Sequence, residues 1–300
     1  MPRELPVVQF PGTEEPPLFE RIGIVGLGLI GGSIALRARR VWPRALVIGV
    51  DSHDVLEKAM LLHAIDVAAT DLTIIGGAQL VVFAMPIGAI IERLGELPAF
   101  LAGPAVVTDV GSTKREICEA AASLPERLVF IGGHPMAGSA EHGVEHARAD
   151  LFDGRRWLLV PPRASGNGGS LSATAVGQVE QFVRAMGAEP SMIGADDHDR
   201  LMAALSHLPQ MAATVLMDVV GERAGERLDL AGDGLKDTTR LAASSIEIWR
   251  DICATNRDAL RAALLQYAKA IGAAADALED RDALDDLFSR AHAWRRRLEE

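Results

Sequence analysis

Short apolar runs alternate with segments of helical spacing along the first two-thirds of the chain. The strand candidates lie at 21–27, 45–50, 80–84, 105–109, 128–131, 156–160 and 189–193, and the first of them is mostly β-branched at 22–25, which favours a strand. Segments with apolar residues three and four positions apart lie between several of them, at 30–40, 53–63, 114–122 and 171–186. This alternation predicts parallel βαβ units in a doubly wound α/β sheet.

The pattern changes after about residue 194, where no further strand is indicated. Apolar residues recur at steps of three and four at 198–219, 260–278 and 287–298, which is typical of amphipathic helices that pack along one face. We therefore expect a flexible, proline-rich tail at 1–19, an α/β domain at 20–193 and an all-helical domain at 194–300. A Gly- and Ser-rich segment at 165–170 is expected to form a surface loop.

The apolar faces of the helical half need a packing partner. Either they form an ordinary core within one chain, or some of them pack against a second copy. We expect a homodimer through the helical domain, and light scattering at micromolar concentration distinguishes the two cases.

Composition narrows the class of protein. The formal net charge is −11, so nonspecific binding to nucleic acid is not expected, and an anionic substrate needs a local cluster of Arg, Lys and His. No apolar run is long enough to predict a membrane span, and the N-terminus has no signal-peptide pattern. Cys118 and Cys253 have neither metal-site nor disulfide spacing, which fits reduced thiols in the cytoplasm, and no metal site is indicated.

A glycine motif follows the first predicted strand and opens the first predicted helix. Gly26, Gly28 and Gly31 form the pattern GxGxxG. In this motif the first glycine permits a tight turn, the second lets a pyrophosphate approach the backbone, and the third lets helix and strand pack closely. The N–H groups of Leu29 and Ile30 lie at the helix N-terminus, where an anion is favoured. The motif therefore predicts a Rossmann-type dinucleotide-binding domain.

Asp51 indicates which dinucleotide is bound. It ends the next predicted strand, where a carboxylate accepts hydrogen bonds from a ribose 2′-OH and repels a 2′-phosphate. No arginine follows it, although His53 is a partial partner for a phosphate. NAD is therefore expected rather than NADP. Pro86 closes a later strand, where it either walls the adenine-side ribose or simply starts a loop.

Two more strand ends carry candidate catalytic groups. Residues 109–112 end one predicted strand and 132–139 end the next, so both point at the cofactor's edge of the sheet. His134 is preceded by two glycines and followed by a proline, which suits a general base held in one position. Oxidation of an alcohol carbon needs such a base on the hydroxyl. Ser112 is placed to hydrogen-bond the imidazole and fix its tautomer.

Six short motifs occur in order along the chain. They are GLGLIGGS at 26–33, DVGSTK at 109–114, GHPMAGS at 133–139, SHLP at 206–209, KDTTR at 236–240 and WRDI at 249–252. Together they resemble the prephenate and arogenate dehydrogenases of tyrosine biosynthesis, over about residues 20–256. The resemblance implies a Rossmann-type domain followed by a helical dimerisation domain.

The resemblance also implies roles for matching residues. His134 corresponds to the catalytic histidine that bonds the ring hydroxyl, and Ser112 to the residue that orients it near the nicotinamide. Ser139 corresponds to a residue lining the substrate pocket, and His207 to one in the first long helix of the second domain, at the interdomain cleft.

Arg240 and Lys236 imply how a substrate with carboxylates is held. The resemblance assigns the side-chain carboxylate to Arg240, with Lys236 one helical turn earlier on the same face. The alternative is that both cations only neutralise nearby aspartates. Gln210 and Ala140 depart from the family, because many prephenate-specific members carry a histidine at the first position and many relatives a charged residue at the second. These changes touch the pocket that distinguishes prephenate from arogenate.

The expected reaction is the oxidative decarboxylation of prephenate to 4-hydroxyphenylpyruvate with reduction of NAD. Arogenate, which gives tyrosine directly, stays open as the substrate. A β-hydroxyacid dehydrogenase, which relies on a catalytic lysine in its helical domain, and a non-catalytic NAD-binding sensor also stay open. His134 and Arg240 argue against the sensor.

Overall fold

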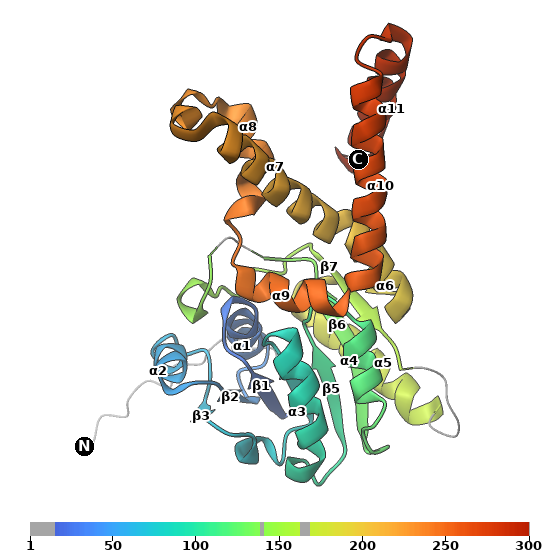
Figure 1. Cartoon of the computed structure of the whole chain (residues 1–300). Helices are drawn as coiled ribbons and strands as arrows, with labels where there is room; N and C mark the ends of the chain where they lie inside the picture. The colour runs from blue at the N-terminus through green and yellow to red at the C-terminus, as the bar shows by residue number, and fades with distance from the viewer. Residues whose placement is uncertain (1–15, 139–140, 163–168, 300) are drawn as a thin grey trace, which may run out of the picture. The chain divides into compact units, whose positions relative to one another are not determined.

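The computed structural model describes residues 16–138, 141–162 and 169–299. By its internal contacts the chain divides into two compact units (Figure 1). Unit 1 comprises Met1–Asp199 with Ser244–Thr255, and unit 2 comprises Arg200–Ala243 with Asn256–Glu300. This grouping differs from the predicted boundaries, because the segment 244–255 returns to unit 1. Most of the predicted tail at 1–19 and of the predicted loop at 165–170 lies outside the described residues.

Unit 1 is built on an eight-stranded sheet with the order β3-β2-β1-β4-β5-β6-β7-β8. The strands are β1 (Arg21–Val25), β2 (Leu46–Val50), β3 (Val67–Ala69), β4 (Leu80–Phe83), β5 (Ala105–Asp109), β6 (Leu128–Pro135), β7 (Arg156–Val160) and β8 (Glu189–Met192). Neighbouring strands are parallel except β6 and β7, which run antiparallel. The predicted doubly wound α/β fold is confirmed, with one antiparallel step that the pattern did not predict.

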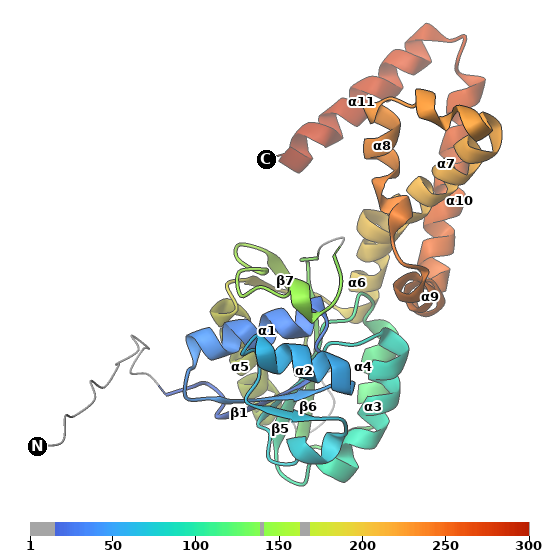
Figure 2. The same ribbon diagram turned by 90° about the vertical axis from the view of Figure 1, so that its left-hand side faces the viewer.

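Helices cover both faces of this sheet (Figure 2). One face packs against α1 (Leu29–Val41), α2 (His53–Leu61) and α5 (Gly169–Ala185). The other packs against α3 (Ile87–Phe100) and α4 (Arg115–Ala121), and Ile252 of α9 (Ile246–Thr255) joins the same core beside α3. Along β4, Leu80 and Val82 belong to the first core, and Val81 and Phe83 to the second. Burial on both faces explains why central strands such as β4 are uninterrupted apolar runs. Two short 3₁₀ helices, η1 (Leu72–Ile75) and η2 (Val144–His146), complete the unit.

The sequence pattern misses β3 and α3 and ends β6 too early. α3 contains two glycines and Pro98, which weaken a helix, although its buried positions keep helical spacing. β6 continues through Gly133 to Pro135, and this added part pairs with β7. A Cβ atom on Gly133 would lie 2.4 Å from the carbonyl oxygen of Asp109, so packing requires glycine there. His134 consequently lies inside a strand.

The regular elements in the described residues of unit 2 are all helices. Its elements are η4 (Ala203–His207), α7 (Leu208–Ala224), η5 (Gly225–Leu230), α8 (Asp233–Thr239), η6 (Arg240–Ala243), α10 (Arg257–Asp276) and α11 (Arg281–Glu299). α6 (Ala195–Met202) leads into it from unit 1. The helix expected over 198–219 is found as part of one continuous helical stretch, in which η4 is a π-helical segment. Pro209 has no N–H for the carbonyl of Leu205, four residues earlier, which explains the wider turn.

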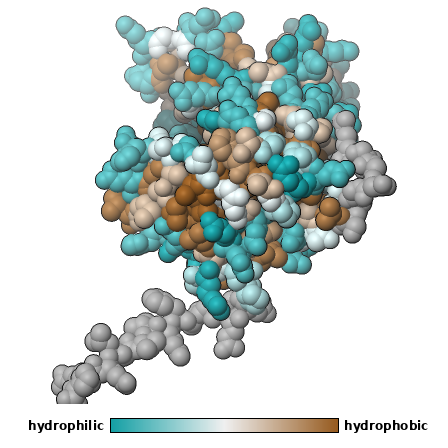
Figure 3. Space-filling model, turned by 90° about the horizontal axis from the view of Figure 1, so that it is seen from below, coloured by the Kyte–Doolittle hydropathy of each residue, from teal (hydrophilic) through white to brown (hydrophobic). Residues whose placement is uncertain are grey.

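Many apolar side chains of unit 2 are exposed. Examples that are more than half exposed are Leu205, Val215, Leu230, Leu265, Ile271, Leu278, Phe288, Trp294 and Leu298. By length and composition alone, the helical stretch Ala195–Leu230 would also suffice to cross a membrane. A single stretch of this kind is weak evidence for a membrane span. Figure 3 shows the underside of the molecule, where hydrophilic and hydrophobic side chains are interspersed.

Candidate active site

The loop between β1 and α1 has the shape that a dinucleotide needs. Gly26 has a φ of 94°, in the left-handed region that side chains disfavour. A Cβ atom on Gly31 would lie 1.9 Å from the carbonyl oxygen of Gly26, so α1 starts directly against the loop. At Gly28 a Cβ atom would meet nothing within 4 Å, so the loop is open on that side. Leu29 and Ile30 form the first turn of α1, where N–H groups point at an anion. The loop therefore fits the pyrophosphate of NAD.

Asp51 lies at the end of β2, next to this loop. Its Oδ2 accepts the N–H of Leu27 at 2.7 Å, and its Oδ1 accepts the N–H of Ser52 at 2.6 Å. These two bonds fix the carboxylate against the glycine loop. Each oxygen of a carboxylate accepts two hydrogen bonds, so Asp51 keeps capacity for ribose hydroxyls.

Pro86 lies just after β4 and immediately before α3. Its ring is exposed, and its carbonyl accepts the N–H of Ile90 at 3.0 Å, which starts the helix. β4 neighbours β1, so Pro86 and the glycine loop follow adjacent parallel strands. Its contact with the cofactor ribose stays a prediction.

Asp109 ends β5 and holds the next strand end in place. Its side chain is completely buried and forms an ion pair with the equally buried Nζ of Lys114. The same oxygen, Oδ2, accepts the N–H of Gly111 at 2.8 Å, while Oδ1 accepts the N–H of Gly133 at 3.0 Å. Through its bond to Gly133, Asp109 therefore ties β6 to β5 one residue before His134.

His134 lies in β6 opposite Leu158 of β7 and is partly exposed. Its Nδ1 lies 2.9 Å from Nε2 of His198, a completely buried histidine of α6. Nδ1 of His198 lies 2.8 Å from Oδ1 of Asp199. The candidate base is thus the outer member of a row of two imidazoles and a carboxylate. Ser112 is half-buried between β5 and α4, and its bond to His134 stays a prediction.

The carboxylate of Asp199, in α6, is bonded to the backbone at the start of α4. Its Oδ1 accepts the N–H of Lys114 at 2.7 Å, and its Oδ2 accepts the N–H of Arg115 at 3.0 Å. Burial alone would raise the pKa of Asp199, but the hydrogen bonds from His198, Arg115 and Lys114 outweigh it and hold the pKa below its ordinary value. Burial lowers the pKa of His198 by more than its bond to Asp199 raises it. The pair therefore consists of an ionised carboxylate and a neutral imidazole at neutral pH.

The predicted residues of the first long helix lie in and beside the π-helical turn. His207 is buried, and its Nδ1 lies 3.1 Å from Nδ2 of Asn256 at the start of α10. Gln210 is also buried, and its Nε2 donates to the carbonyl of Leu241 at 2.8 Å. Gln210 therefore ties α7 to η6, the segment that begins with Arg240.

The two predicted cations lie on neighbouring short helices of unit 2. Arg240 is exposed at the start of η6, and Lys236 is exposed on α8. Nζ of Lys236 lies 3.3 Å from Oδ1 of Asp233, which agrees with the alternative that this lysine neutralises an aspartate. An ion pair this exposed is weak, so Lys236 is able to turn toward an anionic ligand. Ser139 lies outside the described residues.

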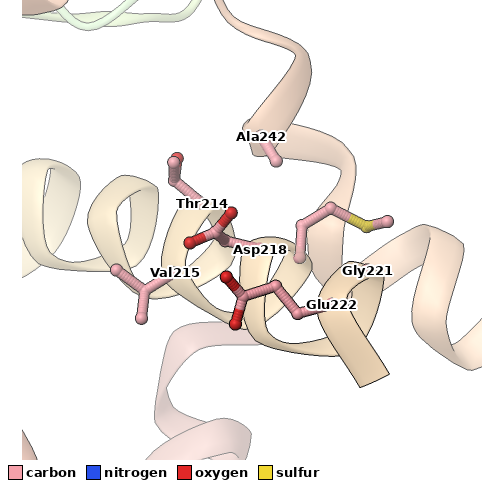
Figure 4. A pocket seen from close by; sticks show the side chains of 7 residues that line it. Thr214, Val215, Asp218, Gly221, Glu222 and Ala242 are labelled. Carbon is pink, nitrogen blue, oxygen red and sulfur yellow. The ribbon is translucent and has the colours of Figure 1, made fainter. Parts of the chain in front are cut away.

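A separate hollow of about 620 Å³ lies along α7 (Figure 4). Asp218 and Glu222 of α7 line it together with Ala242 of η6. Two carboxylates at its wall repel an anionic substrate, so we do not assign the substrate site to this hollow. Among the described residues, no group of three or more His, Cys, Asp or Glu side chains could hold a metal ion, and Cys118 and Cys253 form no disulfide.

His134 lies at the sheet edge that the sequence predicts, but its two partners were not predicted. His198 and Asp199 follow Asp196 and Asp197, and such a polar cluster is usually the solvated start of a helix. The available signal was spacing, because His198 precedes the buried Met202 by one helical turn and therefore lies on the apolar face.

A glycine loop before α1, a carboxylate at the end of β2 and an imidazole at the end of β6 define the chain as an NAD-dependent dehydrogenase. Comparison with known proteins shows the family. Residues 34–191 match the model of the prephenate dehydrogenase nucleotide-binding domain, and residues 194–290 match the model of the prephenate dehydrogenase dimerization domain. The chain belongs to the prephenate dehydrogenase family.

Individual relatives agree with this assignment. The prephenate dehydrogenase of Bacillus subtilis is 32% identical over 278 residues, which cover 90% of this chain and 72% of that protein. The crystal structure of Synechocystis arogenate dehydrogenase is 30% identical, with a TM-score of 0.77 over 93% of this chain and 99% of that one. The prephenate dehydrogenase from A. aeolicus, solved with hydroxyphenyl propionate and NAD+, is 27% identical, with a TM-score of 0.83 over 93% of this chain and 98% of that one.

Proposed function

We propose that this enzyme converts prephenate to 4-hydroxyphenylpyruvate and CO₂ with reduction of NAD. The observation that carries the proposal is the position of His134. It lies partly exposed at the end of β6, at the sheet edge of the glycine loop, and its Nδ1 is bonded to a buried imidazole. A histidine in this place suits a general base for a substrate hydroxyl.

The chain's own residues would hold the cofactor. The first turn of α1 and the open side of Gly28 would receive the pyrophosphate, and Asp51 would accept hydrogen bonds from the adenosine ribose. When bound, NAD supplies the two-electron oxidant that takes hydride from the ring carbon bearing the hydroxyl. Because Asp51 also repels a 2′-phosphate, we expect NAD to be preferred over NADP.

His134 would remove the proton from the ring hydroxyl as that carbon becomes a carbonyl centre. The electron pair of the bond to the ring carboxylate then enters the ring, CO₂ departs, and the ring becomes a phenolate. The phenolate takes the proton back from His134 and becomes the phenol of the product. Aromatisation drives this sequence, so the protein mainly positions the substrate and accepts one proton. Ser112 would contribute by orienting the imidazole.

Substrate carboxylates would be bound by cations of unit 2. We assign the side-chain carboxylate to Arg240, whose guanidinium forms two parallel hydrogen bonds with such a group, and we place Lys236 nearby as a second positive charge. Ser139, His207 and Gln210 are proposed to line the same pocket. Arogenate differs from prephenate only in carrying an amino group in place of the side-chain keto group, and it is the alternative substrate.

We further propose that the enzyme works as a cytoplasmic homodimer. The matched dimerization domain and the exposed apolar side chains of unit 2 support this arrangement. Trp294 and Leu298 are 66% and 78% exposed, which is unfavourable for side chains of this size unless a partner covers them. Light scattering that shows a monomer at micromolar concentration would exclude the dimer.

One experiment tests the function directly. NADH formation is followed with prephenate and arogenate side by side, each with NAD and with NADP. We expect the highest kcat/KM with prephenate and NAD. Absence of turnover with both cyclohexadienyl substrates, together with oxidation of 3-hydroxy acids, would instead favour a β-hydroxyacid dehydrogenase. NADH binding without any turnover would favour a sensor.

A further inference from the structure

The candidate base His134 is the end of a buried hydrogen-bonded row. The row continues through His198, which is completely buried, to Asp199, whose side chain is 3% exposed. None of the motifs that identified the family includes these two residues. A buried imidazole and carboxylate placed directly behind a catalytic group require a physical explanation.

The position of each proton in the row follows from its inner end. Both oxygens of Asp199 accept backbone N–H groups at the start of α4, so this carboxylate is held as an acceptor. An ionised carboxylate has no proton to donate, so the bond of 2.8 Å to His198 must be donated by Nδ1–H of that histidine. Because His198 is neutral, its Nε2 then carries a lone pair.

The same reasoning fixes the tautomer of His134. A lone pair on Nε2 of His198 can only accept, so the bond of 2.9 Å must be donated by Nδ1–H of His134. In a neutral imidazole the other nitrogen then carries the lone pair. Nε2 of His134, the ring nitrogen that does not face the buried row, is therefore the basic atom.

We propose that His198 and Asp199 are positioning residues for the reaction: they hold His134 as the Nδ1–H tautomer, keep Nε2 basic, and stabilise the imidazolium that forms when Nε2 takes the substrate proton. This inference rests on the proposed function, because it assumes that His134 is the base. No further group needs to change its protonation. The proton that arrives stays on Nε2 until the phenolate product takes it back, and the row only supplies an oriented acceptor and, one imidazole further in, a negative charge.

Other charged groups near the row do not cancel this effect. Lys114, the residue before α4, disfavours a positive His198, whereas Asp199 and Asp109 favour it. Lys114 is itself paired with Asp109, so these two largely neutralise each other. The remaining charge is the carboxylate of Asp199 at the inner end. An alternative role for Asp199 is purely structural, as the residue that fixes the first turn of α4, and the test must separate the two.

The first measurement needs no substitution. The full-length protein is labelled with ¹⁵N-histidine, and the ring nitrogens of His134 are assigned by comparison with the His134→Asn spectrum. We expect a protonated Nδ1 and an unprotonated Nε2 at neutral pH. A spectrum in which Nε2 carries the proton would overturn the proposal, whether or not any variant folds.

Two substitutions at His198 then separate positioning from structure. In His198→Gln, the amide donates to Asp199 and its oxygen still accepts from Nδ1–H of His134, so the tautomer is kept. His198→Phe preserves the ring's size and removes the acceptor. We expect His198→Phe to lower kcat by about 10²–10³-fold with little change in KM, in the range of general-base effects, and His198→Gln to recover most of it. A folded His198→Phe enzyme with kcat within a few-fold of wild type would refute the positioning role.

A matched control addresses the helix start. Thr113 is the residue before Lys114, and its Oγ1 is hydrogen-bonded to Oγ1 of Thr255 at 2.8 Å. This bond lies outside the row. Thr255→Val should change thermal stability without altering the His134 tautomer or kcat. If Thr255→Val lowers kcat as much as His198→Phe does, a structural role explains both. Failure of the proposed function is distinguishable, since the wild-type enzyme would then form no NADH from prephenate or arogenate while the tautomer could still be read.

Discussion

Replacing Lys114 by methionine tests how strongly the buried ion pair beneath His134 stabilises unit 1. Both side chains of the Lys114–Asp109 pair are 0% exposed, so the substitution leaves a buried carboxylate without its cation. Breaking a buried pair in this way costs about 3–5 kcal/mol. Two backbone N–H groups still reach the carboxylate, from Gly111 and Gly133, so we expect a loss near the lower end, about 3 kcal/mol.

The assay is urea unfolding at fixed protein concentration, followed by tryptophan fluorescence, because Trp157 is 1% exposed within unit 1. The matched control is the double variant Asp109→Asn with Lys114→Met, which removes both charges and keeps an oxygen for the N–H of Gly133. Replacing both members of a buried pair is often close to neutral, so the double variant should recover most of the loss. A single variant that loses under about 1 kcal/mol, as an exposed pair would, refutes the reasoning.

Three further predictions concern the cofactor, the substrate and pH. Gly28→Ala should leave Tm unchanged, since the added Cβ meets no protein atom within 4 Å, and it should weaken NADH binding measured by fluorescence. Gly31→Ala should lower Tm, because its Cβ would lie 1.9 Å from a carbonyl oxygen. Equal Tm values for the two variants would contradict this prediction. Arg240→Ala should raise KM for prephenate at least tenfold with a smaller change in kcat, and an unchanged KM would remove its binding role. Burial holds the pKa of His198 below its ordinary value of 6.5, so the unfolded chain binds an extra proton below that pH, and wild-type stability should fall as pH drops below about 6.5. In urea titrations His198→Gln should show a shallower fall, and an identical pH dependence would count against it.

The parts of the fold that follow from local pattern were predictable from the sequence. β5 and β7 are found at the predicted residues, because strands buried on both faces read as continuous apolar runs. The glycine motif also predicted its loop from local sequence, because a Cβ atom at Gly26 or Gly31 would collide with nearby backbone.

What the sequence did not reveal depends on contacts between distant segments. β6 extends past Gly133 only because Asp109 and β7 provide partners for its backbone. The row behind His134 joins residues 64 positions apart, and no local pattern indicates that α6 supplies the partner. The return of α9 to unit 1 depends in the same way on the N–H of Gly88, which donates to Asp251 at 2.9 Å.

The central claim is that the imidazole of His134 removes the proton from the ring hydroxyl of prephenate while NAD takes the hydride. The most direct measurement is NADH formation by His134→Asn with saturating prephenate and NAD, alongside the dissociation constant for NADH. We predict that kcat falls by about 10²–10⁴-fold while NADH binds as in the wild type. An asparagine variant that turns over at nearly the wild-type rate would contradict the account.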